Sequence, residues 1–340
     1  MADARLLLLS CGSADFAGAG VVHMTGGICA LVTAKVIKAR NGRFRSDGTV
    51  YRLPQQSPAL QTLGALILWV GWYGFNGGSV GSISNGRSVL VAKAVVNTTI
   101  AAASSVLSMG ISVKAMHKKF DSAHLNNGIL SGLVAISASG PLVEVEGAFV
   151  IGVFASAFYM LGTWLLVRLK IDDVVQASPV HFGCGVWGLM ASGLLSTKEN
   201  YRGVYNYGVF FDRGREDTCC GLFYGCGWNL LGANMLFCAA VIPWVGGLSL
   251  LAVFCIKATV GLRVPLHVEE IGMDKSRHQR SKGNVALRRA MRSASAKVDK
   301  ESAMASKRSS FKSSTITSPS RAPSAGQQLL HWRDGISQRR

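Results

Sequence analysis

The chain alternates between long uncharged, largely apolar stretches and short segments where its charged residues gather. Aspartate, glutamate, lysine and arginine are absent from 16–34, 53–86, 94–113, 122–143, 147–167, 174–197 and 218–256. A helix needs about 20 mainly apolar residues to cross a hydrocarbon core roughly 30 Å thick, and every stretch is long enough for one. A soluble helical protein would bury one such stretch, whereas seven in series favour seven transmembrane helices. The two longest stretches also hold a polar loop.

Composition supports the same fold class. The chain has 340 residues, of which 49% are hydrophobic and 16% charged, and 39 are glycine. Soluble domains carry about 25% charged residues, and membrane helices pack through small residues. We therefore predict an all-α, polytopic transmembrane helical bundle of about seven spans.

The charged segments predict an orientation. With seven spans, 35–52, 114–121, 168–173 and the tail from Lys257 share one side and carry 6, 3, 2 and 18 Lys plus Arg. The segments on the other side (1–15, 87–93, 144–146 and 198–217) carry 1, 2, 0 and 4. Basic loops face the cytoplasm, which places the N-terminus outside and the C-terminus inside.

Three parts follow from this pattern: a short extracellular lead-in (1–15), a transmembrane domain (16–257) and a cytoplasmic tail (258–340). The tail has 17 Lys plus Arg, 6 Asp plus Glu and 14 serines, a composition that does not fold alone. It is either a solvated basic tail or a segment that meets anionic lipid or takes phosphate, for example at Ser293. The net charge of +18 resides largely in the cytoplasmic segments and no aromatic stripe accompanies it, so it does not indicate nucleic acid.

The eight cysteines fall into two groups. One group lies in the predicted spans, where cysteine acts as a small apolar residue: Cys29, Cys184, Cys238 and Cys255. The other group lies on the predicted outer side: Cys11, Cys219, Cys220 and Cys226. The sequence allows an outer disulfide but assigns no pairing.

Two apolar stretches share one motif. "DFAGAGVVHMTGG" (15–27) and "DVVQASPVHFGCG" (173–185) each have an aspartate, a histidine eight residues later and a glycine four further on. Eight residues of helix rise about 12 Å, so His23 and His181 approach the midplane from opposite sides. Matched motifs on antiparallel spans indicate an inverted repeat, whose site lies where the repeats meet. A single such histidine would indicate an interhelical hydrogen bond, and Asp15 and Asp173 are expected to cap and orient the helices that bear the histidines.

Several segments together resemble the ammonium transporter family (Amt/Mep/Rh) of the plant and algal type. They are "DFAGAGVVHMTGG" (15–27), "LGALILWVGWYGFNGGS" (63–79), "AVVNTTIAAA" (94–103), "NGILSGLVAISAS" (127–139), "IDDVVQASPVHFGCGVWG" (171–188) and "EEIGMDKSRH" (269–278). The resemblance implies a homotrimeric transporter, not an enzyme, with no cofactor. Each protomer of the family has eleven spans in two inverted halves around a narrow apolar pore.

The resemblance also implies roles for particular residues. His23 and His181 match the two pore histidines, Phe75 matches a phenylalanine of the outer gate, and Ser79 matches a serine of the outer ammonium site. Trp72 lies in the same motif beside the pore. An outer site would recruit ammonium through hydrogen bonds and cation–π contact, ammonia would cross the apolar pore, and imidazole could pass a hydrogen bond or a proton. Without the resemblance, Phe75 and Trp72 indicate packing and Ser79 a loop.

The chain departs from the family pattern in its first spans, near 141–148 and in the tail, where Ser276 replaces the usual threonine and "RHQR" (277–280) lacks the family's Gly-Gly. "DFAG" opens the family's fifth span, so the first four spans are expected to be missing through a truncated gene model or fragment. "PLVEVEGA" (141–148) stands where the family has a Glu-Pro-Trp run.

The tail holds a candidate switch. In the family, an ordered segment corresponding to residues near 265–280 docks on the neighbouring protomer, and phosphorylation by a kinase shuts transport. Ser276 occupies the phosphorylated position. A phosphate there would be repelled by Asp274, Glu269 and Glu270, undocking the segment; the alternative is an ordinary exposed serine.

The functional prediction is ammonium transport across a membrane, expected to be the plasma membrane. Two alternatives stay open: an ammonium sensor whose tail signals to a partner or a non-transporting fragment, and a membrane redox protein with His23 and His181 as axial haem ligands.

Overall fold

The computed structural model describes residues 11–51, 53, 55–118, 120–205, 219–273, 275 and 276. These residues form two compact units, which divide after Ala39, Tyr51 and Gly261. Within the described ranges the regular structure is helical and no strand is present; a single isolated bridge pairs Phe44 with Val50. The predicted all-α fold class is therefore confirmed. The tail beyond Ser276, Ser293 included, lies outside the described residues.

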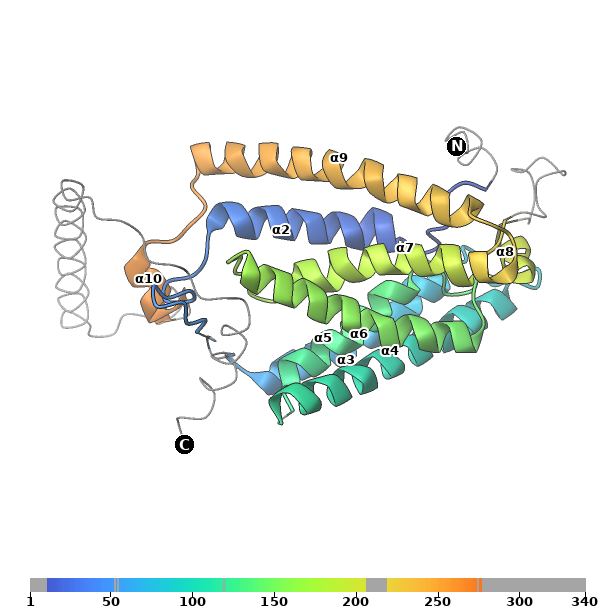
Figure 1. The fold of residues 1–340 in the computed structure, drawn as a ribbon, viewed down its shortest axis with the longest axis horizontal. Helices are drawn as coiled ribbons and strands as arrows, with labels where there is room; N and C mark the ends of the chain where they lie inside the picture. The colour runs from blue at the N-terminus through green and yellow to red at the C-terminus, as the bar shows by residue number, and fades with distance from the viewer. Residues whose placement is uncertain are drawn as a thin grey trace, which may run out of the picture. The chain divides into compact units, whose positions relative to one another are not determined.

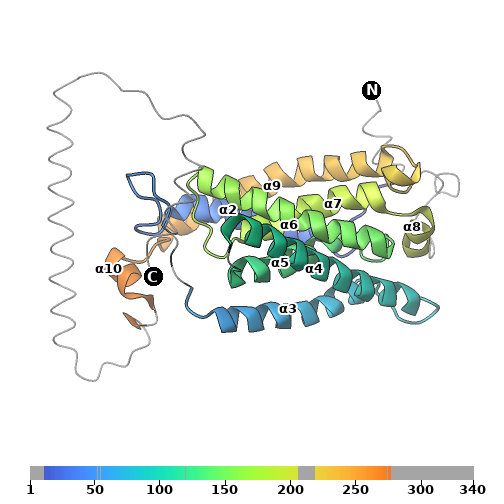
Figure 2. The same ribbon diagram turned by 60° about the horizontal axis from the view of Figure 1, so that its bottom comes forward.

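Each of the predicted uncharged stretches contains a helical segment of the first unit. These segments are η1 (Ala19–Met24) with α2 (Thr25–Ile37), α3 (Pro58–Gly78), α4 (Ser88–His117), α5 (Ser122–Ile136), α6 (Val145–Arg168), η2 (Ser178–Gly183) with α7 (Cys184–Leu195), and α9 (Asn229–Thr259). They lie side by side along one direction (Figures 1 and 2). The shorter α8 (Lys198–Tyr205) and η4 (Leu222–Tyr224) follow α7.

Four of the described helices are long and apolar enough to cross a membrane. They are Ala19–Ile37, Ser88–Met116, Val145–Arg168 and Asn229–Thr259. The other three predicted spans, which hold α3, α5 and η2 with α7, stay predictions.

The centre of the bundle is close-packed through glycine. Gly132 of α5 and Gly152 of α6 both face the backbone carbonyl of Ala101 on α4, where an added Cβ would overlap that oxygen. Tyr159 and Leu133 are fully buried in the same cluster. Small residues at these crossings let the helix backbones approach one another, as in other membrane helix bundles. This packed block supports the helices that carry the site.

Helix α4 begins six residues earlier than the uncharged stretch and so includes Lys93. The Nζ atom of Lys93 donates to Glu144 Oε1 and Asn200 Oδ1, both at 2.8 Å, and Asn200 Nδ2 donates to the same Glu144 oxygen at 2.8 Å. A charge is tolerated on this helix because it is paired and hydrogen-bonded. Glu144 is the N-cap residue of α6. The hydrogen bond from Lys93 lowers the pKa of Glu144 below its ordinary value of 4.5.

This cluster predicts a pH dependence of stability. A lowered pKa in the folded state means that ionised Glu144 stabilises the fold above pH 4.5, and that this contribution is lost as the pH falls through the folded-state value. We expect Glu144→Gln to lower the thermal unfolding midpoint at pH 7, and the gap to wild type to close towards pH 3.5. Thermal unfolding of the purified protein at both pH values measures this. Glu146→Gln, which removes an exposed carboxylate two residues away, is the control, and a gap that widens in acid would contradict the prediction.

The four cysteines predicted to lie on the outer side form two disulfides. Cys11 pairs with Cys219 across 208 residues, with Cα atoms 5.4 Å apart, and Cys220 pairs with Cys226. Tyr201 of α8 donates its hydroxyl hydrogen to the carbonyl of Cys11 at 2.7 Å. Segments predicted to share one side of the membrane therefore meet at one end of the bundle, where Figure 1 shows α8, whereas α3 begins at the other end.

The second unit joins the loop 40–51 to α10 (Leu266–Ile271). Asn41 donates its backbone N–H to Glu269 Oε1 at 2.8 Å and its side-chain N–H to Glu270 Oε1 at 3.1 Å. Arg263 binds both carboxylate oxygens of Glu269. The predicted regulatory segment thus begins with a short helix, α10, whose carboxylates bind Asn41 and Arg263.

Candidate functional site

Both motif histidines lie in π-helical turns. His23 is in η1 and His181 is in η2, and each π turn continues into an α-helix. In η1 the backbone N–H of His23 donates to the carbonyl of Gly18, five residues earlier, at 3.1 Å. Single π turns are rare and often occur at functional sites. The sequence did not reveal them, because an apolar stretch has the same composition in either helix type.

The two motif aspartates precede the helices instead of starting them. Asp15 Oδ2 accepts the backbone N–H groups of Gly20 and Val21, both at 3.0 Å. Asp173 Oδ2 accepts the N–H and the hydroxyl of Ser178, at 2.7 and 2.6 Å. Since η1 begins at Ala19 and η2 at Ser178, the prediction of eight helical residues between each aspartate and its histidine is wrong. Each carboxylate accepts hydrogen bonds from residues at the start of its π turn, while itself lying outside the helix.

The motif glycines are the points where the two histidine-bearing segments cross. A Cβ atom on Gly27 would overlap the backbone nitrogen of Phe182, the residue after His181. A Cβ on Gly185 would lie 2.6 Å from the carbonyl oxygen of Ala19 and 3.1 Å from the nitrogen of Met24, the residue after His23. The contacts are reciprocal, as in the two halves of a repeat. Glycine four residues after each histidine lets the backbones approach closely enough for the rings to meet.

The crossing places four aromatic rings together. The centroids of His23 and His181 are 5.4 Å apart and their planes are inclined by 19°. His23 also stacks on Trp72, with ring centroids 5.1 Å apart, and contacts Phe75, with centroids 5.5 Å apart. Trp72 is fixed by a 3.0 Å hydrogen bond from its Nε1 to the hydroxyl of Ser137 at the end of α5. His23 and Trp72 are buried, whereas Phe75 is 37% exposed.

Both histidines keep a buried nitrogen without a partner among the residues described. These atoms are Nε2 of His23 and Nδ1 of His181. A buried polar atom that makes no hydrogen bond costs roughly 1–3 kcal/mol. A small polar solute that reached these nitrogens would satisfy them.

The remaining predicted residues lie apart from the ring contacts. Ser79 is at the end of α3, one turn after Phe75, and its hydroxyl donates to the Phe75 carbonyl at 2.7 Å. Ser276 is in the second unit and donates its hydroxyl hydrogen to the carbonyl of Met273 at 3.1 Å. Glu269 already binds Arg263 and Asn41, and Asp274 lies outside the described residues.

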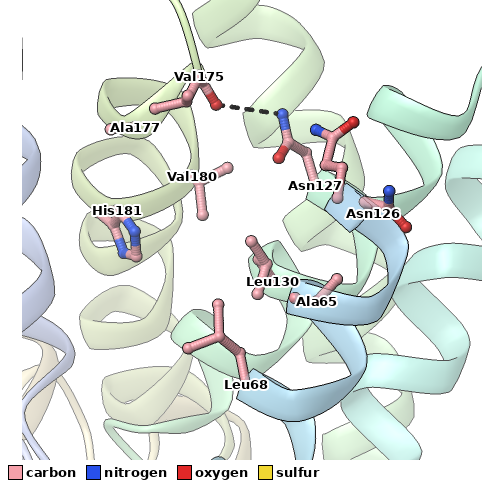
Figure 3. Close-up of a pocket in the computed structure, with 11 residues that line it drawn as sticks. Ala65, Leu68, Asn126, Asn127, Leu130, Val175, Ala177, Val180 and His181 are labelled. Carbon is pink, nitrogen blue, oxygen red and sulfur yellow. Dashed lines mark hydrogen bonds between the residues drawn. The ribbon is translucent and has the colours of Figure 1, made fainter. Parts of the chain in front are cut away.

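A cavity of about 240 Å³ adjoins His181. Figure 3 shows His181 on one side of it and Asn126 and Asn127 of α5 on the other, with Val180 between them. Gln61 of α3 also lines it. Sequence reasoning did not single out these amides. The available signal was weak, because the two uncharged stretches that hold these amides also contain Gln55, Gln56, Asn76 and Asn85.

Comparisons with known proteins agree on one family. A profile of the Ammonium Transporter Family matches residues 4–282. Ammonium transporter 1 member 1 of Arabidopsis thaliana is 35% identical over 281 residues, covering 80% of this chain and 54% of that protein. Ammonium transporter Amt2 of Archaeoglobus fulgidus is 33% identical over 267 residues, covering 78% and 54%.

Solved structures show the same relationship. A structure titled "Sensor Amt Protein" superimposes with a TM-score of 0.67 at 32% identity, covering 78% of this chain and 60% of that one. Saccharomyces cerevisiae Mep2 gives a TM-score of 0.66 at 26% identity, covering 77% and 55%. The chain therefore spans about half the length of the curated relatives it matches. By its sequence, its helical fold and its structural neighbours, the chain belongs to the Ammonium Transporter Family.

Proposed function

We propose that this chain carries ammonium nitrogen across a membrane, along the path of rings that runs from Phe75 past Trp72 and His23 to His181. The observation that supports this most strongly is the contact of these four rings, with Phe75 exposed at one end and a cavity adjoining His181 at the other. The names of the curated relatives, which are ammonium transporters, support the same substrate.

The proposed mechanism separates the cation from the neutral molecule. Ammonium is attracted to the exposed face of Phe75 by cation–π contact, with the Ser79 hydroxyl as a nearby hydrogen-bonding group. A bare cation is costly in an apolar environment, so neutral ammonia continues past the rings. The free nitrogens of His23 and His181 exchange hydrogen bonds with it and pass the released proton separately.

The setting of this activity is part of the proposal. The basic segments 35–52, 114–121 and 168–173 face the cytoplasm, in a plasma membrane. The chain acts as a homotrimer, and a kinase acting on Ser276 regulates it. Glu269 is already paired with Arg263, so it would repel a phosphate on Ser276 less than the sequence alone indicated.

Reconstitution of the purified full chain into liposomes tests the proposal. We expect an ammonium gradient to drive a current that protein-free liposomes lack, because ammonia and its proton both cross. A faster rise of the internal pH without a current would show that ammonia crosses alone and takes up a proton inside. Vesicles containing the chain that respond no faster than empty ones would contradict transport.

A second candidate is an ammonium sensor, which is favoured by the likeness to a structure titled "Sensor Amt Protein". A sensor binds ammonium and changes the state of its tail. Comparing flux by the intact chain and by a chain ending after Ser276 separates the two. A sensor gives ammonium binding without flux in both forms, whereas a transporter gives flux.

A further inference from the structure

The cavity adjoining His181 contains carboxamide side chains that the proposed ring path does not use. Gln61, Asn126 and Asn127 come from the first two turns of α3 and α5 and line a space of about 240 Å³. A water molecule occupies about 30 Å³ in the liquid. The cavity therefore has room for an ammonium ion, which is about as large as water, together with several waters.

Hydrogen bonds decide which groups of these amides remain for a ligand. Asn127 Nδ2 donates to the Tyr159 hydroxyl and to Gln176 Oε1, both at 3.1 Å, and lies 3.4 Å from the Val175 carbonyl oxygen, the contact drawn in Figure 3. Asn126 Nδ2 donates to the hydroxyl oxygen of Thr62 at 3.1 Å. An amide nitrogen has only two N–H groups. Asn127 therefore presents its carbonyl oxygen to a ligand, and Asn126 keeps its carbonyl oxygen for the same use.

Gln61 supplies the most direct indication of a ligand. Its Oε1 atom is buried and accepts no hydrogen bond from the described part of the chain. An acceptor in this condition loses roughly 1–3 kcal/mol relative to water unless a donor reaches it. The Gln61 side chain lines the cavity, but Oε1 itself has almost no surface open to it, so the amide must rotate before a group in that space can donate to this oxygen.

We propose that this cavity is a second ammonium site, on the opposite side of the histidine pair from Phe75, with Gln61 Oε1 and the asparagine carbonyl oxygens as its ligands. A set of acceptors favours ammonium, which has only donors, over ammonia, which also has a lone pair. Its place in transport rests on the function proposed above, whereas the binding itself can be measured without transport.

Titration of ammonium chloride into the purified full chain, against sodium chloride at equal ionic strength, tests this site. Loss of one hydrogen bond to a cation costs roughly 1.5–3 kcal/mol, so Gln61→Leu should weaken one class of binding by about tenfold or more. Gln61→Glu should tighten the same class, because a carboxylate attracts a cation more strongly than an amide oxygen does. A variant that merely misfolds cannot bind more tightly. Gln55→Leu, an exposed position three residues before α3 and outside the cavity, should change nothing.

The same titration in Phe75→Ala separates this site from the proposed recruitment site. We expect Phe75→Ala to remove a different class of binding from the one that Gln61 controls. If the Gln61 variants change binding and Phe75→Ala does not, the cavity site stands and recruitment at Phe75 fails. If both Gln61 variants bind ammonium as wild type does, the cavity site is overturned, whatever the transport measurements show.

Discussion

Gly27→Ala is expected to separate the two histidine rings and to destabilise the protein. The added methyl group would overlap the backbone nitrogen of Phe182, which cannot rotate away as a side chain could. Overpacking of this kind costs roughly 1–3 kcal/mol. Because Phe182 follows His181 directly, the backbone shift that relieves the overlap also moves His181 away from His23. We expect a lower thermal unfolding midpoint and a loss of ammonium flux.

The adjacent glycine provides a matched control. A Cβ on Gly26 would meet no atom within 4 Å, although both glycines lie in the first turn of α2. Gly26→Ala should therefore be neutral, or stabilising by up to about 1 kcal/mol through helix propensity. Gly185→Ala should reproduce the effect of Gly27→Ala, since it meets the backbone of Ala19 and Met24 from the other side. Equal unfolding midpoints for Gly26→Ala and Gly27→Ala would show that the crossing is not tight.

Replacing either histidine should reduce the ammonium-dependent current strongly. A positioned group that transfers a proton accelerates a reaction by about 10²–10⁴-fold, so we expect His23→Ala or His181→Ala to lower this current in liposomes by about a hundredfold. Removing either imidazole also leaves a gap that water can enter, because the rings of His23 and His181 contact one another. His23→Gln is more informative, because an amide keeps hydrogen-bonding groups but does not carry a proton. It should retain ammonia entry while losing the accompanying current.

His267→Ala is the control for these variants, because His267 lies on α10 in the second unit and not among the rings. Unfolding midpoints identify any variant that fails through folding. If His23→Ala and His181→Ala both retained wild-type flux and current, the ring row would not be the path.

Much of the fold could be predicted from where charges are absent. A charge is costly in a helix surrounded by apolar groups unless it is paired, so uncharged stretches coincide closely with the helices. One boundary failed where a partner changed this cost. Helix α4 includes Lys93, because Glu144 and Asn200 bind its ammonium group. The pattern of charges along the chain does not show a pairing between residues 93, 144 and 200.

The sequence by itself determined the helical class, the pairing of two Asp–His–Gly motifs and the choice of His23 and His181. These follow from local composition and spacing, which need no knowledge of neighbours. Only the tertiary structure decided that both histidines occupy π turns, that Asp15 and Asp173 stand before their helices, and that each motif glycine faces the residue after the other histidine. It also brought Gln61, Asn126 and Asn127 around one cavity. Such features depend on the distance between backbones that are far apart in the chain, and packing of several helices at once sets that distance.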